Sequence, residues 1–224
     1  MGEVIVQDAI STPFLHPFTA VIAGATGSGK TQFLTNALIH ADKVIDKPIH
    51  RLVYCYGVYL DKTFQILKKY FPQIELINGI DSTLDFDSKI NNILILDDLM
   101  QDTVKSSVVS DYFTRGSHHK NLSVILLTQN IFHQGSMSRT INFNCHYTIM
   151  FKNPRNAQQI DYIGAQMYVG NKRKALKEAY ADAISRPYGY IFIDYKQNCP
   201  DMMRLKTNIL PTDPQPCIVY VPKE

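Results

Sequence analysis

Residues 18–31 read FTAVIAGATGSGKT, and this stretch decides the class of fold. A short apolar run leads into a glycine-rich loop, and the loop leads into a stretch of helical character. The residues that fit the pattern G-x-x-x-x-G-K-[S/T] of a phosphate-binding loop are Gly24, Gly29, Lys30 and Thr31. Because the pattern requires a strand before the loop and a helix after it, the context favours a P-loop over a chance glycine-rich turn. The sequence therefore predicts a P-loop nucleotide-binding domain.

Each part of this loop has an expected role in holding ATP. The glycines let the backbone curl until successive N–H groups point at the β-phosphate, and the helix that follows adds its positive end. We expect Lys30 to neutralise the β- and γ-phosphate oxygens and the Thr31 hydroxyl to ligate Mg²⁺. The expected nucleotide-contacting residues are Gly24, Ala25, Thr26, Gly27, Ser28, Gly29, Lys30 and Thr31. ATP and Mg²⁺ are thus the predicted cofactors.

A second apolar run ends in two acids, at residues 93–98 (ILILDD). This is the layout of a Walker B strand. We expect Asp97 to hold Mg²⁺ through its water shell, and Asp98 to orient or deprotonate the attacking water. A buried strand that leaves the core through a solvated acidic turn has the same pattern. The P-loop upstream favours the Walker B interpretation.

A third apolar run, 123–128, ends at Gln129. In P-loop enzymes with an additional strand between the P-loop strand and the Walker B strand, a polar residue at this position faces the γ-phosphate. Gln129 can donate to a phosphate oxygen or orient the attacking water. A lone glutamine at a strand end carries little weight. Its place after the P-loop and the acid pair makes it the predicted sensor residue.

Apolar runs and helical stretches alternate along most of the chain. The runs are continuous, as expected for strands that are covered on both faces. They are 18–23, 52–56, 74–77, 93–96, 124–127, 147–151 and 190–193. Helices are expected at 31–40, 62–70, 103–114, 155–167 and 171–184. This order predicts an α/β fold of the additional-strand type, with a mostly parallel central sheet flanked by helices.

The length of 224 residues fits one α/β core with small appendages. We divide the chain into an N-terminal arm (1–13), a P-loop ATPase domain (14–210) and an irregular, Pro-rich C-terminal strap (211–224). The formal net charge of +3 excludes an acidic tail protein and a histone-like polycation, and it leaves nucleic acid open as a partner.

Targeting signals and cysteine spacing indicate an intracellular protein without a membrane span. No apolar run approaches the roughly 20 residues that span a bilayer. The N-terminal sequence MGEVIVQDAIST lacks the basic-then-apolar layout of a signal peptide. No pair among the four cysteines has metal-ligand spacing, so buried thiols in a reducing compartment are expected.

The remaining motifs separate the candidate reactions. A nucleotide kinase needs a lid with several arginines, whereas the arginines here are scattered. A GTPase would carry an N/T-K-x-D motif, which is absent. An acid pair with Gln129 is suited to attack by water, so hydrolysis is favoured. A P-loop phosphotransferase acting on a small molecule and a nucleotide-dependent scaffold with little turnover stay open as alternatives.

Ring ATPases gate hydrolysis with an arginine from the neighbouring subunit, which is worth roughly 10³–10⁵ in rate. Arg115 is the first candidate, in the segment TRGSHHK (114–120) between the acid pair and the Gln129 run. Lys120 shares this segment and can exchange roles with Arg115, and Arg139 follows the Gln129 run. A single surface arginine is usually only solvated, so the assignment stays open between Arg115 and Arg139.

Several motifs in combination carry a resemblance to a known family. They are GATGSGKT (24–31), DDLM (97–100), TRGSHH (114–119) leading into 124–130, and FKNPR (151–155). Together they resemble the genome-packaging ATPases of the FtsK–HerA superfamily, most of all the poxvirus-type and Polinton-type viral branch. The resemblance extends over roughly residues 14–210.

The resemblance implies a RecA-like core, a homo-oligomeric ring of about five or six subunits, and ATP-driven movement of double-stranded DNA into a preformed capsid. It also implies capsid vertex or portal proteins as partners. The site of action is then the host cytoplasm or nucleus where virions assemble, with association with the virion as a further option.

The family's roles can be carried over position by position. They fall on Lys30 and Thr31 (nucleotide and Mg²⁺), Asp97 (Walker B), Asp98 (catalytic acid position), Gln129 (sensor) and Arg115 (near the finger region). Many ring ATPases carry Glu where Asp98 stands, so the shorter side chain must reach its water differently.

DNA contacts are harder to place, because a net charge of +3 is small for a protein that grips phosphates. A ring solves this by repeating a few basic residues around its pore. The densest basic cluster is Lys172, Arg173, Lys174 and Lys177. A solvated helix face has the same pattern, and the loop 131–139 is an alternative pore element.

Overall fold

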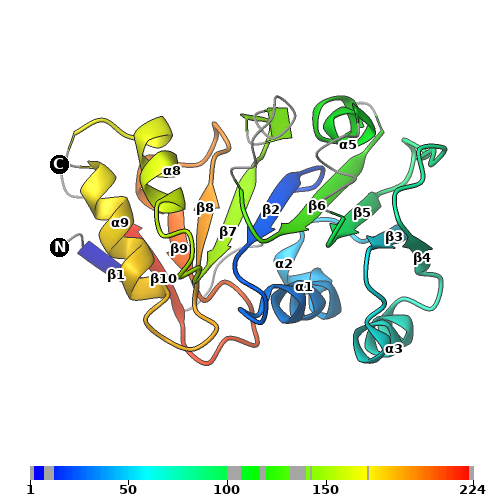
Figure 1. The fold of residues 1–224 in the computed structure, drawn as a ribbon, viewed down its shortest axis with the longest axis horizontal. Helices are drawn as coiled ribbons and strands as arrows, with labels where there is room; N and C mark the ends of the chain where they lie inside the picture. The colour runs from blue at the N-terminus through cyan, green and yellow to red at the C-terminus, as the bar shows by residue number, and fades with distance from the viewer. Residues whose placement is uncertain are drawn as a thin grey trace.

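The computed structural model describes residues 3–7, 13–99, 107–116, 120–131, 140–141, 143–170 and 172–221. Its centre is a ten-stranded sheet in the order β1-β10-β9-β8-β7-β2-β6-β5-β3-β4 (Figure 1). The strands are β1 (Glu3–Gln7), β2 (Thr19–Ala23), β3 (Arg51–Tyr56), β4 (Glu75–Asn78), β5 (Asn92–Asp97), β6 (Leu122–Thr128), β7 (Tyr147–Phe151), β8 (Tyr190–Asp194), β9 (Leu205–Thr207) and β10 (Cys217–Val221). The helices are α1 (Lys30–Ile39), α2 (Ala41–Val44), α3 (Asp61–Tyr70), α5 (Ser107–Asp111), α8 (Gln159–Met167) and α9 (Lys172–Ala183), with a π-helical turn η1 (Tyr112–Gly116) and a 3-10 turn η2 (Asp201–Met203).

One half of the sheet is parallel. The strands β4, β3, β5, β6, β2 and β7 all run in the same direction. The other strands, β8, β9, β10 and β1, continue the sheet in antiparallel pairs. The strand that precedes Gln129, β6, lies between the P-loop strand β2 and the Walker B strand β5. The mostly parallel sheet and its additional strand are therefore confirmed.

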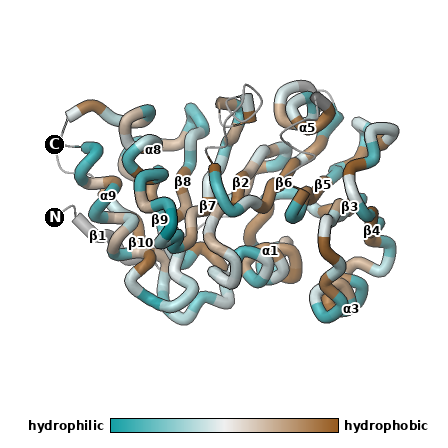
Figure 2. The backbone as a smooth tube through the Cα atoms, viewed as in Figure 1, coloured by the Kyte–Doolittle hydropathy of each residue, from teal (hydrophilic) through white to brown (hydrophobic). Residues whose placement is uncertain are grey.

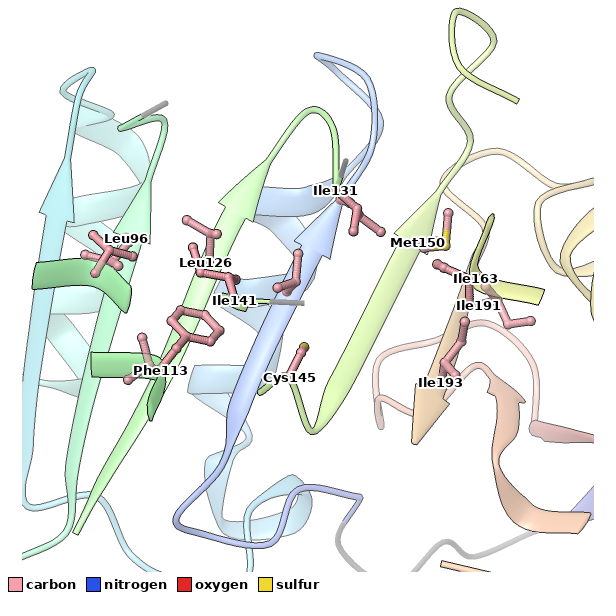
Figure 3. Packing of buried hydrophobic residues seen from close by; sticks show 14 of the residues in the cluster. Leu96, Phe113, Leu126, Ile131, Ile141, Cys145, Met150, Ile163, Ile191 and Ile193 are labelled. Atoms are coloured by element: carbon pink, nitrogen blue, oxygen red, sulfur yellow. The ribbon is translucent and has the colours of Figure 1, made fainter. Parts of the chain in front are cut away.

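Helices cover both faces of the sheet, because successive side chains on a strand point to opposite faces. On β2, Ile22 packs on one face with Leu34 of α1, whereas Val21 belongs to the core on the other face with Ile163 of α8 and Leu176 of α9. Figure 2 shows the apolar residues concentrated along the central strands. Figure 3 shows part of the core on the face of the sheet that carries Val21. Both faces of the central strands are buried, as their continuous apolar runs indicate.

Three strands lie where the sequence pattern predicted none. They are β1 in the expected arm, β9 near the end of the expected domain, and β10 in the expected strap. Since β1 pairs with β10 and Glu3 lies opposite Val221, the two ends of the chain extend the same sheet. The expectation of an irregular strap was wrong for residues 217–221, because this segment pairs with β1 on one side and β9 on the other. The domain boundaries at 13 and 210 stay a prediction.

Two expected helices differ from the structure. The expected helix over 155–167 begins only at Gln159, because the N–H of Arg155 bonds to Oδ1 of Asn153 at 3.3 Å and a turn occupies the intervening residues. The expected helix over 103–114 is in part α5 and η1, and residues 103–106 lie outside the described residues. Within the described part of the chain, none of the helices combines the length and the apolar character needed to cross a membrane.

Candidate active site

The carboxyl ends of β2, β5 and β6 meet at one edge of the sheet. Ala23 lies opposite Thr128, and Asp97 lies opposite Leu127. The N–H of Gly24 donates to the carbonyl of Thr128 at 3.2 Å, which ties the start of the P-loop to the end of β6. The three motifs that the sequence predicted to act together therefore share one edge of the sheet.

Lys30 is folded back onto the loop that carries it. Its Nζ donates to the carbonyl oxygens of Gly24 at 2.8 Å and Ala25 at 3.0 Å. Burial lowers the pKa of Lys30, and the nearby charges of Asp97 and Asp98 oppose that shift. The ammonium group thus lies between the loop carbonyls and the acid pair, where a phosphate that enters the loop meets a partly desolvated cation.

The glycines of the loop are required by close contacts and by backbone conformation. A Cβ at Gly24 would lie 2.6 Å from the Cβ of Phe151, so a larger residue would collide with β7. Gly29 has a φ of 107°, a left-handed conformation that side chains disfavour, directly before α1. The hydroxyl of Ser28 is buried and has no hydrogen-bond partner among the described residues. The loop therefore offers an unused polar group as well as backbone N–H groups to a ligand.

Asp97 is buried at the end of β5, with a tyrosine from the neighbouring strand as its partner. The hydroxyl of Tyr54 donates to Oδ2 of Asp97 at 2.6 Å. Burial raises the pKa of the Asp97 carboxyl, the hydrogen bond from Tyr54 lowers it, Asp98 raises it and Lys30 lowers it. Burial raises the pKa of Tyr54 far above its ordinary value, so Tyr54 stays a donor. The pair holds one carboxylate oxygen in a fixed position.

Asp98 is exposed, and its backbone adopts a φ of 53°, in the left-handed region that few residues other than glycine occupy. The residue that follows β3 holds this turn, because the N–H of Gly57 donates to the carbonyl of Asp97 at 2.9 Å. A Cβ at Gly57 would lie 2.3 Å from the carbonyl oxygen of Asp98. The position of the predicted catalytic acid therefore depends on a glycine in the neighbouring strand connection.

Gln129 is exposed directly after β6, so its side chain is free to meet a ligand. Its backbone is tied to the connection between β7 and α8, because Nδ2 of Asn153 donates to the carbonyl of Gln129 at 3.0 Å. Two further hydrogen bonds join the same two segments. Nδ2 of Asn156 donates to Oδ1 of Asn130 at 3.3 Å, and the N–H of Ile131 donates to Oε1 of Gln159 at 3.1 Å. Asn153 of the FKNPR motif, with Asn156 and Gln159 after it, therefore holds the backbone segment that carries the predicted sensor.

The donor set at this edge suits Mg²⁺ bound together with a nucleotide. Asp97 supplies a carboxylate whose Oδ1 receives no hydrogen bond from the described residues, and the Thr31 hydroxyl lies at the start of α1. Across the described residues, no three His, Cys, Asp or Glu side chains gather as a metal site of their own. Magnesium is bound through one or two protein oxygens plus substrate phosphates, so Thr31 and Asp97 fit this ion.

The candidate finger residues are described only in part. The backbone of Arg115 lies in η1, on the return path from β5 to β6, and its side chain lies outside the described residues. Arg139 and the His118–His119 pair also lie outside them. Lys120 lies just before β6, at the opposite edge of the sheet from Gln129, and its Nζ is 2.8 Å from Oδ1 of Asp85.

The basic cluster of α9 is engaged within the chain. Lys177 lies 3.1 Å from Oδ1 of Asp161, and Lys174 lies 3.9 Å from Oε1 of Glu178. Arg173 donates to the carbonyl of Tyr168 at 2.7 Å. These partners favour a solvated helix face over a dedicated DNA-binding surface. The alternative pore loop, 131–139, lies outside the described residues except at Ile131.

Three residues of the site gave no clear signal in the sequence. Tyr54 and Gly57 act across the β3–β5 pair, so only the register of these strands reveals them. Asn153 belongs to the FKNPR motif, which contributed to the family resemblance. The Asn-Pro pair in this motif predicted the start of a helix and no role in the site. None of the three belongs to a motif with a known chemical role. Contacts between segments that are distant in sequence place them in the site.

Comparisons with known proteins agree with this architecture. A family model described as Poxvirus A32 protein matches residues 12–184. The chain is similar in fold to the genome packaging NTPase B204 from Sulfolobus turreted icosahedral virus 2 in complex with ATP-gammaS, with a TM-score of 0.53, 16% identity, and coverage of 88% of this chain and 97% of that chain. It is also similar to EssC (ATPases 2 and 3) from Geobacillus thermodenitrificans, with a TM-score of 0.52, 12% identity, and coverage of 93% of this chain and 40% of that chain. The curated proteins contain no significant match to the chain.

Proposed function

The chain belongs to the poxvirus A32 protein family, and we propose that it hydrolyses ATP to drive double-stranded DNA into a viral capsid. One observation carries this proposal: the P-loop, the buried Asp97 and the exposed Gln129 meet at one edge of the sheet. The similar fold of B204, a genome packaging NTPase in complex with ATP-gammaS, supports it. We place its action inside the infected cell, with the capsid vertex or portal as partner.

Binding of ATP begins with the P-loop. Backbone N–H groups of the loop and the N-terminus of α1 hold the β-phosphate, and Lys30 turns from the carbonyls of Gly24 and Ala25 to the phosphate oxygens. Thr31 and Asp97 would hold Mg²⁺, which would supply positive charge against the phosphates of the nucleotide. Tyr54 fixes the orientation of Asp97 for this purpose.

Hydrolysis then needs only a positioned water and a stabilised leaving group. The water attacks the γ-phosphorus, the bond from this phosphorus to the β,γ-bridging oxygen breaks, and ADP and phosphate are released. Asp98 accepts the proton that the water loses, and Gln129 orients the water or donates to a γ-phosphate oxygen. Lys30 stabilises the charge that develops on the β,γ-bridging oxygen.

Coupling to DNA requires an assembly. We propose a homo-oligomeric ring of about five or six subunits, in which Arg115 or Arg139 of one subunit completes the site of the next. The net charge of +3 and the ion pairs on α9 supply little grip in a single subunit. A ring repeats the same few cations along the phosphate backbone, so DNA binding should strengthen with assembly.

Phosphate release measured with and without linear duplex DNA tests this function. We expect Mg²⁺-dependent ATP hydrolysis that rises with duplex DNA and disappears in Lys30→Ala. Transfer of phosphate to an added nucleoside, independent of DNA, would identify a small-molecule phosphotransferase instead. An assembled, DNA-bound protein without turnover would identify a nucleotide-dependent scaffold.

A further inference from the structure

A cavity of roughly 460 Å³ lies beside the P-loop, on the side away from the acid pair. Three segments line it: the first half of the loop (25–28), the start of the β7–α8 connection at Lys152 and Pro154, and the turn 184–189 between α9 and β8. The lining is mainly apolar around the turn. This volume lies within the range of about 300–1,000 Å³ that is typical of small-ligand sites.

The turn 184–189 is firmly built. The N–H of Gly189 donates to the carbonyl of Arg186 at 3.1 Å. A Cβ at Gly189 would lie 2.1 Å from the carbonyl oxygen of Ala183, so the turn closes tightly onto the end of α9. Ser185 Oγ donates to the carbonyl of Asp182 at 2.6 Å. The wall that the turn adds to the cavity is therefore held by backbone contacts before any ligand binds.

Tyr188 is the aromatic residue of this wall. Its ring packs beside the P-loop, because Cδ1 would lie 3.2 Å from a Cβ placed on Gly29. The side chain is still 72% exposed, and its backbone has a φ of 60° in the left-handed region. A non-glycine residue in this conformation is uncommon, and here it places a large aromatic ring at the edge of a nucleotide loop without burying it.

The topology fixes which end of a nucleotide faces the cavity. The residues for γ-phosphate chemistry, Asp97, Asp98 and Gln129, follow β5 and β6, on one side of the P-loop strand β2. The cavity is bounded by segments attached to β7 and β8, on the other side of β2. If the γ-phosphate faces the acids, the remainder of the nucleotide extends toward the cavity.

We propose that this cavity binds the base of ATP, and that the ring of Tyr188 stacks on it. The inference rests on the proposed ATPase function and adds the element that recognises the base. Pro154, Pro187 and Ile184 supply the apolar surroundings that a purine face needs. Stacking on an aromatic ring tolerates any base, so the site adds affinity for nucleotides over simple polyphosphates.

Calorimetric binding of two probes, MgATP and magnesium tripolyphosphate, tests the assignment. Tripolyphosphate has the phosphates of ATP without the base. In Tyr188→Ala we expect ATP to bind about 10- to 100-fold more weakly, the usual effect of removing a stacking ring, with tripolyphosphate affinity unchanged. Tyr188→Phe keeps the ring and should bind both probes like the unmodified protein. Because Tyr188 is exposed, Tyr188→Ala should unfold at the same temperature, which thermal unfolding checks.

Other binding results for Tyr188→Ala would overturn the base site. Equal weakening of both probes in Tyr188→Ala means that Tyr188 acts through the P-loop and Gly29, and no weakening means that the base lies elsewhere. If only assembly of the protein fails, the cavity holds a neighbouring copy of the chain and not a base. Lys30→Ala should weaken both probes. If the unmodified protein binds neither probe, the proposed ATPase function fails, and the base site fails with it.

Discussion

The hydroxyl of Tyr54 in β3 donates a 2.6 Å hydrogen bond to Oδ2 of Asp97 at the end of β5, on the face of the sheet that α1 covers. The bond joins a buried donor to the carboxylate that we assign to Mg²⁺. It leaves Oδ1 as the oxygen for the ion and its water shell. The site therefore depends on a residue that no nucleotide-binding motif contains.

Replacing Tyr54 tests this dependence. Tyr54→Phe removes the donor and keeps the ring against Phe64. We expect the Mg²⁺ concentration for half-maximal ATP hydrolysis to rise about 10- to 100-fold, the usual cost of losing a partner behind a metal ligand. A titration of activity with Mg²⁺ measures it. Tyr56→Phe, on the same strand, is the control, and an equal effect in both variants would contradict a specific role for Tyr54.

Asp97→Asn should separate stability from activity. Burial raises the pKa of Asp97, so the folded protein favours the protonated form, and the stability from that form is lost as pH rises through the raised pKa. At neutral pH the uncharged Asn should therefore raise the free energy of unfolding by about 0.5–2 kcal/mol while hydrolysis is lost. The gain should shrink as pH falls through that pKa. Urea unfolding between acidic and neutral pH checks this, and a variant less stable at neutral pH would refute it.

Gly57→Ala should disturb the turn that carries Asp98. The new Cβ would lie 2.3 Å from the carbonyl oxygen of Asp98, so the backbone must shift. We expect a loss of about 1–3 kcal/mol in the free energy of unfolding, together with a marked fall in kcat. The control is Gly164→Ala in α8, where the nearest atom to a new Cβ is 3.5 Å away and stability should hold or rise. Similar losses in both variants would argue against strain at Asp98.

Asn153 should act through Gln129. Because its amide holds the carbonyl of Gln129, Asn153→Ala should lower kcat about 10- to 100-fold with little change in KM. Combining it with Gln129→Ala gives a double-mutant cycle. The double variant should be no slower than Gln129→Ala alone. Additive losses would mean that Asn153 supports activity by another route.

Mixed assemblies test whether Arg115 acts across a subunit interface. Arg115→Ala subunits and Lys30→Ala subunits should each be inactive, and together they should regain activity where an intact P-loop meets an intact arginine. Lys120→Ala separates the two cations of this segment: because Lys120 pairs with Asp85, we expect its hydrolysis to be unchanged, and a loss would give Lys120 the finger role instead. Complete failure of rescue in confirmed mixed assemblies would exclude a trans role for Arg115.

The parallel half of the fold could be predicted because each of its strands is a continuous apolar run with helices between most of them. The P-loop and the acid pair were equally visible, since their chemistry depends on residues close together in sequence. What escaped prediction depends on contacts between distant segments. The strand β1 pairs with β10 from the other end of the chain, and Asn153 and Asn156, in the segment before α8, bond to the residues that follow β6. Tyr54 and Gly57 matter only through the register of β3 against β5.

If ATP hydrolysis moves the protein along DNA, the moving protein should displace a third strand from a long duplex. The assembled protein is loaded on a linear duplex that carries a labelled triplex-forming oligonucleotide at a distance. We expect release of the oligonucleotide with ATP and Mg²⁺, and no release with ATP-gammaS or with Lys30→Ala. Steady hydrolysis by a DNA-bound assembly that leaves the oligonucleotide in place would mean that the protein hydrolyses ATP without moving along DNA.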